Sequence, residues 1–288
     1  MKKTATSGVM LILISSFFYA SYGIWTSLIG DFMGGYTASA LRSFLVLAIL
    51  IPVAVYFGKT EPLQLRQNGK LLILMTLAST LVWGVLYYSI LNAGIGLSLA
   101  VNYAAITIGM MIFGAVMMSE SLNVTKWISL LIGIAGLGLV FAPAIGTASA
   151  FLPLFAAFVS GLAIAINTIW AKRLTYDTTQ STIMLWTTSV FANTPMLFIF
   201  KEPLPVFELR IEYFYVFMFA VVSILASWLL LEALKSLEAG IAGLIGLTEI
   251  VFGVLFGILL FSEHITFTAA AGIGLIILAA AYPNLHKN

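Results

Sequence analysis

Apolar stretches of about 20 residues, the length an α-helix needs to cross a bilayer, follow one another along the whole chain. Within them apolar residues are continuous, as in Leu71–Leu74 and Ile258–Phe261, and do not alternate with polar ones as they would in a membrane barrel. The pattern therefore predicts an all-α membrane protein. Its ten expected transmembrane helices lie at residues 7–29, 36–58, 70–91, 96–118, 124–142, 149–171, 180–200, 211–233, 239–261 and 265–283.

Composition excludes several other classes of protein. Of the 288 residues, 61% are hydrophobic and 8% are charged, whereas soluble domains average about 45–50% apolar and about 25% charged residues. The net charge of +2 comes from scattered bases, which excludes nucleic-acid binding. The chain has no cysteine and only two histidines, His264 and His286, so we expect no disulfide, no bound metal and no other cofactor.

Basic residues outside the spans indicate the orientation of the chain. With the N-terminus in the cytoplasm, ten lysines and arginines fall in cytoplasmic segments and two, Lys201 and Arg210, in external ones. The apolar run after Met1–Lys3 continues past Trp25 without a small-residue cleavage site, so we interpret it as a retained first helix. We expect a multi-pass protein of the bacterial cytoplasmic (inner) membrane with both termini in the cytoplasm.

The sequence also contains an internal repeat. Because four landmarks recur at one offset without a gap, we predict two five-helix halves, residues 1–143 and 144–288. Five is odd, so the second half enters the membrane from the opposite side, and such inverted repeats are typical of transporters. A shift of 143 residues superposes Pro52 on Pro195, Pro62 on Pro205, Phe113-Gly114 on Phe256-Gly257 and Ser119-Glu120 on Ser262-Glu263.

The end of each half carries a recognisable pattern. The stretches Ile106–Leu122 and Thr248–Ile265, each with a Glu that introduces the last helix, resemble the EamA repeat of the drug/metabolite transporter superfamily. Arg42 matches a basic residue common in that family, whereas Thr107 and Ile250 stand where the family often has proline. The resemblance implies a central cavity between the halves, with the fifth and tenth helices lying away from it.

Two charges lie deep within the predicted spans. Arg42 is about six residues into the second helix, and Glu249 is about ten into the ninth. Ionised groups at such depth are costly and usually mark substrate or proton paths. Their repeat mates, Leu185 and Ile106, are uncharged, which favours recognition of an asymmetric substrate or proton coupling. The alternatives are a structural Arg42–Glu249 ion pair and side chains that reach to the membrane surface.

Polar and aromatic side chains recur at helical spacing on several spans, as in Thr76, Thr80, Trp83 and Tyr87. We expect such side chains to face the substrate path. For Asn102 and Asn167 the alternative interpretation is hydrogen bonding between helices, and for Trp170 it is a place in the aromatic belt at the membrane interface. Gly246, Gly253 and Gly257 share a face with Glu249, either for helix packing or as room for a ligand. The expected substrate-binding or coupling residues are Glu249, Arg42, Trp83, Tyr87, Tyr22, Trp25, Asn102, Tyr103, Asn167 and Trp170.

Other motifs are better explained by a structural role than by a function. Glu120 and Glu263 begin the turn into the last helix of each half, where a carboxylate can meet free N–H groups, so we interpret both as structural. The segment from Lys201-Glu202 to Glu212 is typical of a solvated outer loop. No cluster of His, Asp and Glu is available for chemistry, so we do not expect an enzyme.

The predicted function is secondary active transport by alternating access. The resemblance implies export of an amino acid or related amine, with protons as the candidate coupling ion at Glu249. Expected partners are a small-molecule substrate and the lipid bilayer, and the sequence does not distinguish a monomer from a homodimer. Two alternatives stay open: an uptake carrier for a cationic or quaternary amine such as choline, held by aromatic rings and Glu249, and a non-transporting membrane receptor or scaffold.

Overall fold

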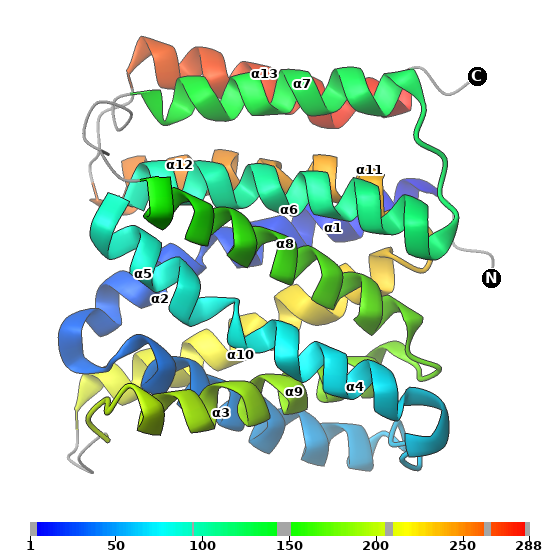
Figure 1. Cartoon of the computed structure of the whole chain (residues 1–288), viewed down its shortest axis with the longest axis vertical. Helices are drawn as coiled ribbons and strands as arrows, with labels where there is room; N and C mark the ends of the chain where they lie inside the picture. The colour runs from blue at the N-terminus through cyan, green and yellow to red at the C-terminus, as the bar shows by residue number, and fades with distance from the viewer. Residues whose placement is uncertain (1–4, 94, 143–150, 205–209, 262–265, 286–288) are drawn as a thin grey trace.

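A computed structural model of the chain describes residues 5–93, 95–142, 151–204, 210–261 and 266–285, and over these residues it contains helices and no strand (Figure 1). The all-helical prediction is confirmed. The helices are α1 (Ala5–Ala20), α2 (Tyr22–Ile29), the short 3₁₀ helix η1 (Gly30–Phe32), α3 (Gly35–Tyr56), α4 (Leu65–Thr80), α5 (Trp83–Ala93), α6 (Ile95–Met118), α7 (Val124–Val140), α8 (Phe151–Arg173), α9 (Thr178–Ile199), α10 (Ile211–Ala233), α11 (Ala239–Gly246), α12 (Thr248–Phe261) and α13 (Phe267–Leu285).

Several of these helices, alone or as consecutive pairs, are long enough to cross a membrane. In the part of the chain that the structure describes, eight segments have the length and hydropathy of a membrane span, and two shorter apolar helices, Val124–Val140 and Phe267–Pro283, accompany them. Each apolar segment expected from the sequence coincides with one helix or with two consecutive ones. The number of ten crossings remains a prediction.

Three of the long segments are interrupted near their middle. The interruptions fall at Ser21 between α1 and α2, at residues 81–82 between α4 and α5, and at Leu247 between α11 and α12. The segments that follow begin with Tyr22, Trp83 and Thr248. The sequence pattern predicts one continuous helix in each place, because each interruption lies within a mostly apolar stretch.

Hydroxyl groups make these interruptions possible in an apolar environment. Where a helix is irregular, a backbone carbonyl loses its regular partner, and in lipid no water replaces it. Serine and threonine side chains can satisfy such carbonyls from the same helix or from a neighbour. Ser21 Oγ donates to the Phe18 carbonyl (2.7 Å), Ser160 Oγ of α8 donates to the Val82 carbonyl (2.7 Å), and Thr248 Oγ1 donates to the Ile245 carbonyl (2.7 Å).

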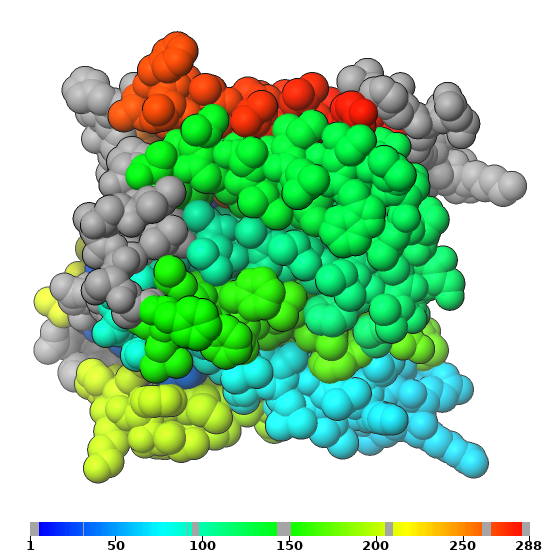
Figure 2. Space-filling view, turned by 45° about the horizontal axis from the view of Figure 1, so that its top comes forward, coloured from blue at the N-terminus to red at the C-terminus, as the bar shows by residue number. Residues whose placement is uncertain are grey.

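Helix contacts follow the 143-residue offset found in the sequence. The mates α3 and α9 pack together, as do the mates α7 and α13, which lie side by side along one edge of the molecule (Figures 1 and 2). The offset makes α8 the mate of α1, and α11 and α12 the mates of α6. The contact of α6 with α8 therefore corresponds to the contact of α11 and α12 with α1. Likewise, α10 is the mate of α4 and α5, so the contact of α1 with α10 corresponds to the contact of α8 with α4 and α5.

At the start of α3 and just before α9, a glutamate from the other half accepts hydrogen bonds from backbone N–H groups. Glu202, just after α9, accepts hydrogen bonds from the backbone N–H groups of Tyr36 (3.1 Å) and Thr37 (2.7 Å) in the first turn of α3. Glu61, after α3, accepts from the Asp177 N–H (2.9 Å) just before α9. Glu202 therefore does more than lie in a solvated loop, because its carboxylate satisfies free N–H groups at a helix N-terminus.

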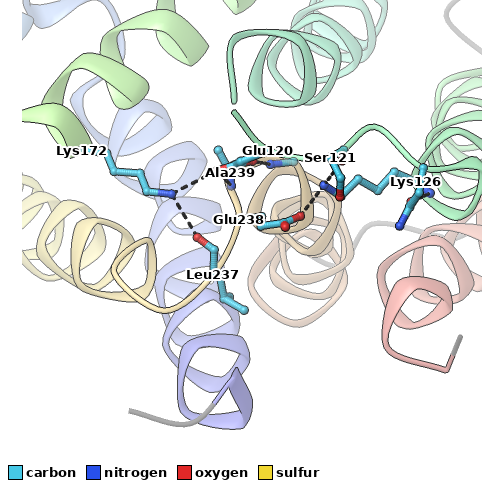
Figure 3. A network of polar contacts seen from close by, with 9 residues as sticks. Glu120, Ser121, Lys126, Lys172, Leu237, Glu238 and Ala239 are labelled. Atoms are coloured by element: carbon cyan, nitrogen blue, oxygen red, sulfur yellow. Dashed lines mark hydrogen bonds and ion pairs between the residues drawn. The ribbon is translucent and has the colours of Figure 1, made fainter. Parts of the chain in front are cut away.

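Glu120 joins the halves at the end of the bundle where α1 begins and α13 ends (Figure 3). Its carboxylate accepts from the backbone N–H groups of Ala239 (2.7 Å) and Gly240 (3.2 Å) at the start of α11, and from Lys172 Nζ (3.2 Å). Lys126 bonds to Glu238 beside it. Glu120 thus caps a helix of the other half rather than the one that follows it. The partner motif at Glu263 lies outside the described residues.

We predict that Glu120→Gln destabilises the fold. The substitution leaves Lys172, whose side chain is 14% exposed, without its charge partner, and the expected loss is about 1–3 kcal/mol of unfolding free energy. Lys235→Gln is the matched control, because Lys235 is 49% exposed and such pairs contribute about 0–1 kcal/mol. Thermal unfolding of the purified variants in detergent measures the two losses of stability. Equal shifts in unfolding temperature would contradict the structural role assigned to Glu120.

We also predict that Gly34→Ala weakens the cap on α3. A Cβ at Gly34 would lie 2.3 Å from Glu202 Oε2, so the carboxylate must move away from the helix N-terminus. The expected cost is that of a lost cap, about 1 kcal/mol. Gly69→Ala on α4 is the control, since a Cβ there meets nothing within 4 Å, and it should leave the unfolding temperature unchanged or raise it.

Candidate functional site

Glu249 lies at the second position of α12, directly after the interruption at Leu247. Tyr103 of α6 donates a hydrogen bond from its hydroxyl to Glu249 Oε1, at 2.5 Å. Tyr19 of α1 lies within electrostatic range of the same carboxylate. No basic side chain among the described residues forms an ion pair with Glu249. A carboxylate deep in the bundle therefore has a phenol as its hydrogen-bond donor and no counter-ion.

Open space adjoins Glu249 on its own helix face. Gly246 and Gly253 lie three residues before and four after Glu249, and a Cβ built on either would meet nothing within 4 Å. Helix packing is therefore not the role of these two glycines. By contrast, a Cβ on Gly243 would lie 3.0 Å from Met110 of α6. Both Glu249 and Tyr103 are half-buried.

Arg42 of α3 is 2% exposed and lies among four aromatic rings. Its guanidinium carbon is 5.3 Å from the centroid of Tyr22, 4.6 Å from Trp83, 5.4 Å from Trp186 and 4.3 Å from Phe219. Aromatic faces attract cations at such distances. We call these four side chains the Arg42 cage. The rings that could hold a quaternary amine thus enclose the protein's own guanidinium.

Arg42 and Glu249 do not form an ion pair with each other in the described residues. Two tyrosines connect the two charges instead. The rings of Tyr19 and Tyr22 contact each other with centroids 5.1 Å apart, and both lie within electrostatic range of Arg42 and of Glu249. The described residues therefore show no structural ion pair between Arg42 and Glu249, and both charges lie near the same two tyrosines.

The structure places the other expected site residues in different surroundings, with Trp25 beside the Arg42 cage. Asn102 Nδ2 donates to the Ala157 carbonyl (3.0 Å) and Asn167 Nδ2 to Ser79 Oγ (2.8 Å), so both asparagines join helices. Tyr87 is 46% exposed, next to Gly35 at the start of α3. Trp170 packs against the main apolar core. Trp25 packs with Tyr22 and Phe219, and its indole nitrogen is buried without a hydrogen-bond partner.

Trp186 and Phe219 belong to the cage although sequence analysis did not select them. Trp186 Nε1 donates to Ser227 Oγ of α10 (2.9 Å), which fixes the indole. Its position in mid-span on α9 was a weak signal, and nothing distinguishes Phe219 from the 20 other phenylalanines. Among the described residues no three His, Cys, Asp or Glu side chains gather as a metal site would require.

Comparison with known proteins identifies the family. A model of the EamA-like transporter family matches residues 6–142 and 151–283. A solved structure titled only "Crystal structure of protein" has a TM-score of 0.78 and 15% sequence identity over 98% of each chain, which shows a shared fold. No curated protein matches. Because the family model covers nearly the whole chain in two successive matches, the resemblance seen in the sequence is confirmed, and the chain belongs to the EamA-like transporter family.

Proposed function

We propose that this protein is a secondary active transporter that exports an amino acid or related amine by alternating access, coupled to protons through Glu249. The observation that carries the proposal is a carboxylate without a counter-ion, held by Tyr103 and bordered by the open space at Gly246 and Gly253. Open space beside a charged group is what a translocation site needs and what a sealed scaffold would lack.

Glu249 is suited to bind a proton and an amine in turn. An ionised carboxylate in an apolar bundle requires compensation, which either a bound proton or a bound ammonium group supplies. Because both ligands need the same oxygens, each excludes the other, and this exclusion couples their movements. Tyr103 holds Oε1 in place, which leaves the second oxygen for the ligand.

The two halves supply the alternating movement in this proposal. We take residues 1–143 and 144–288 as inverted repeats, supported by helix contacts that occur in pairs related by the 143-residue offset. Such a pair has two near-equivalent arrangements, and exchanging them opens the site to either side. With both termini in the cytoplasm, the Glu120 network closes the cytoplasmic side and must break for substrate to enter.

The first test is Glu249→Gln in proteoliposomes. An amide cannot take up the proton but still accepts hydrogen bonds from an amine and from Tyr103, so proton-driven accumulation should be abolished while exchange of internal for external substrate continues. Thermal shift with the twenty amino acids and their decarboxylated amines selects the substrate. Glu212→Gln, outside the site at the start of α10, is the control. Accumulation that persists in Glu249→Gln would exclude the coupling role.

A second test fills the open space. Gly253→Leu should block transport and leave the unfolding temperature within about 2 °C of the unsubstituted protein, because a Cβ at Gly253 meets nothing within 4 Å. Gly274→Leu is the matched control, since a Cβ at Gly274 on α13 also meets nothing within 4 Å. Equal transport by both variants would show that the space near Glu249 is not on the substrate path.

A further inference from the structure

The Arg42 cage contains polar groups that the protein itself does not satisfy. Arg42 Nε is buried without a hydrogen-bond partner, and no ion pair or hydrogen bond joins the guanidinium to any described residue. Two other bases with little exposure are paired: Lys126, which is also 2% exposed, bonds to Glu238 and to the Ser121 carbonyl, and Lys172, whose side chain is 14% exposed, bonds to Glu120. Arg42 therefore differs from them in having donors and no acceptor.

Further unpaired donors surround the same guanidinium. Ser39 Oγ lies on the same face of α3, one turn before Arg42, and Trp25 Nε1 lies in the apolar cluster that contains Tyr22. The hydroxyls of Tyr22 and Ser223 lie close to one another and make no well-aligned hydrogen bond. Buried polar groups in proteins are nearly always paired, so a cluster of unpaired donors requires an explanation.

The geometry of a guanidinium indicates which ligand fits. Aromatic rings stack on its faces, whereas its N–H groups lie in the plane at its edges and match the two oxygens of a carboxylate. None of the four cage side chains accepts a hydrogen bond from the guanidinium among the described residues, so its N–H donors stay unpaired. A positive charge with several donors and no acceptor is complementary to an anion and would repel an amine.

We infer that the Arg42 cage binds the carboxylate of the substrate, which is therefore a zwitterion whose ammonium group binds Glu249. The inference rests on the proposed function and narrows its substrate class from amines in general to molecules that carry both groups. Tyr19 and Tyr22, which lie within electrostatic range of both charges, then border the bound molecule.

The test compares three sets of probes, each an amino acid with the amine and the acid that lack one of its charged groups. The sets are glycine, methylamine and acetate; leucine, 3-methylbutylamine and 4-methylpentanoate; and phenylalanine, 2-phenylethylamine and 3-phenylpropanoate. In at least one set the purified protein should bind the amino acid about tenfold or more tightly than its amine, measured by thermal shift and competition. Arg42→Gln should abolish that preference, and Arg42→Lys should restore part of it.

Two further variants distinguish an effect on ligand binding from an effect on folding. Arg210→Gln is the control, because Arg210 also lies over a ring, Phe32 at 4.9 Å, but is exposed; the preference for the amino acid should survive. Ser39→Ala removes a buried donor that has no partner in the protein. If the donor serves a ligand, this variant should lose affinity for the amino acid several-fold without a fall in unfolding temperature. Unchanged affinity in both Ser39→Ala and Arg42→Gln would overturn the carboxylate site.

The outcomes separate this inference from the proposed function. Binding of an amine as tightly as its amino acid overturns the carboxylate site and leaves amine transport through Glu249 standing. Loss of preference in Arg42→Gln, together with unchanged proton coupling in Glu249→Gln, supports the carboxylate site and excludes the proposed coupling. Binding of none of the nine probes overturns the zwitterion inference, and failure of the whole amine and amino-acid panel overturns the proposed substrate as well.

Discussion

The lack of water in the hydrocarbon core requires every polar group of the spanning segments to find its partner within the protein. This requirement explains the continuous helices, and it also explains where they can be interrupted. The carbonyls at the breaks before Tyr22, Trp83 and Thr248 are each met by a serine or threonine hydroxyl. Interruptions satisfied in this way let a helix change direction at mid-depth, and it is there that the cage and Glu249 lie. Polar groups that still lack partners stand out against this background.

The helix caps that satisfy backbone N–H groups are also contacts that the proposed movement of the two halves must break. Glu120 of the first half satisfies the N-terminus of α11 in the second, and Glu202 of the second half satisfies that of α3 in the first. Each cap is a contact between halves, made by a flexible side chain rather than by packed backbone. In the proposed alternating movement the halves move apart at one end, and water that enters there replaces the carboxylate, so the cost of breaking the cap falls as this gate opens. The same bond thus closes the gate firmly and releases it without leaving buried N–H groups unpaired.

Much of this arrangement is encoded locally and was predictable. Hydropathy located the helical segments, and the scarcity of charge singled out Arg42 and Glu249, because an ionised residue is exceptional in an apolar span. The breaks were not predictable, since the hydroxyl that completes one of them, Ser160, comes from a helix distant in sequence. The cage was only partly predictable for a related reason. Phe219 is one of 21 phenylalanines, and only the tertiary fold decides which of them faces Arg42.

Keeping Arg42 and Glu249 apart has a physical consequence for binding. Had they paired, each would compensate the other, and a ligand would have to break that bond before it gained its own. Aromatic rings stabilise the guanidinium without consuming its hydrogen-bond donors, and Tyr103 supplies one bond to the carboxylate without cancelling its charge. In the proposed site both charges therefore keep their capacity to bind an oppositely charged group of a ligand. A carrier that moves only when loaded needs a difference between empty and occupied states, because a ligand shifts a conformational equilibrium only by its differential affinity for the two states.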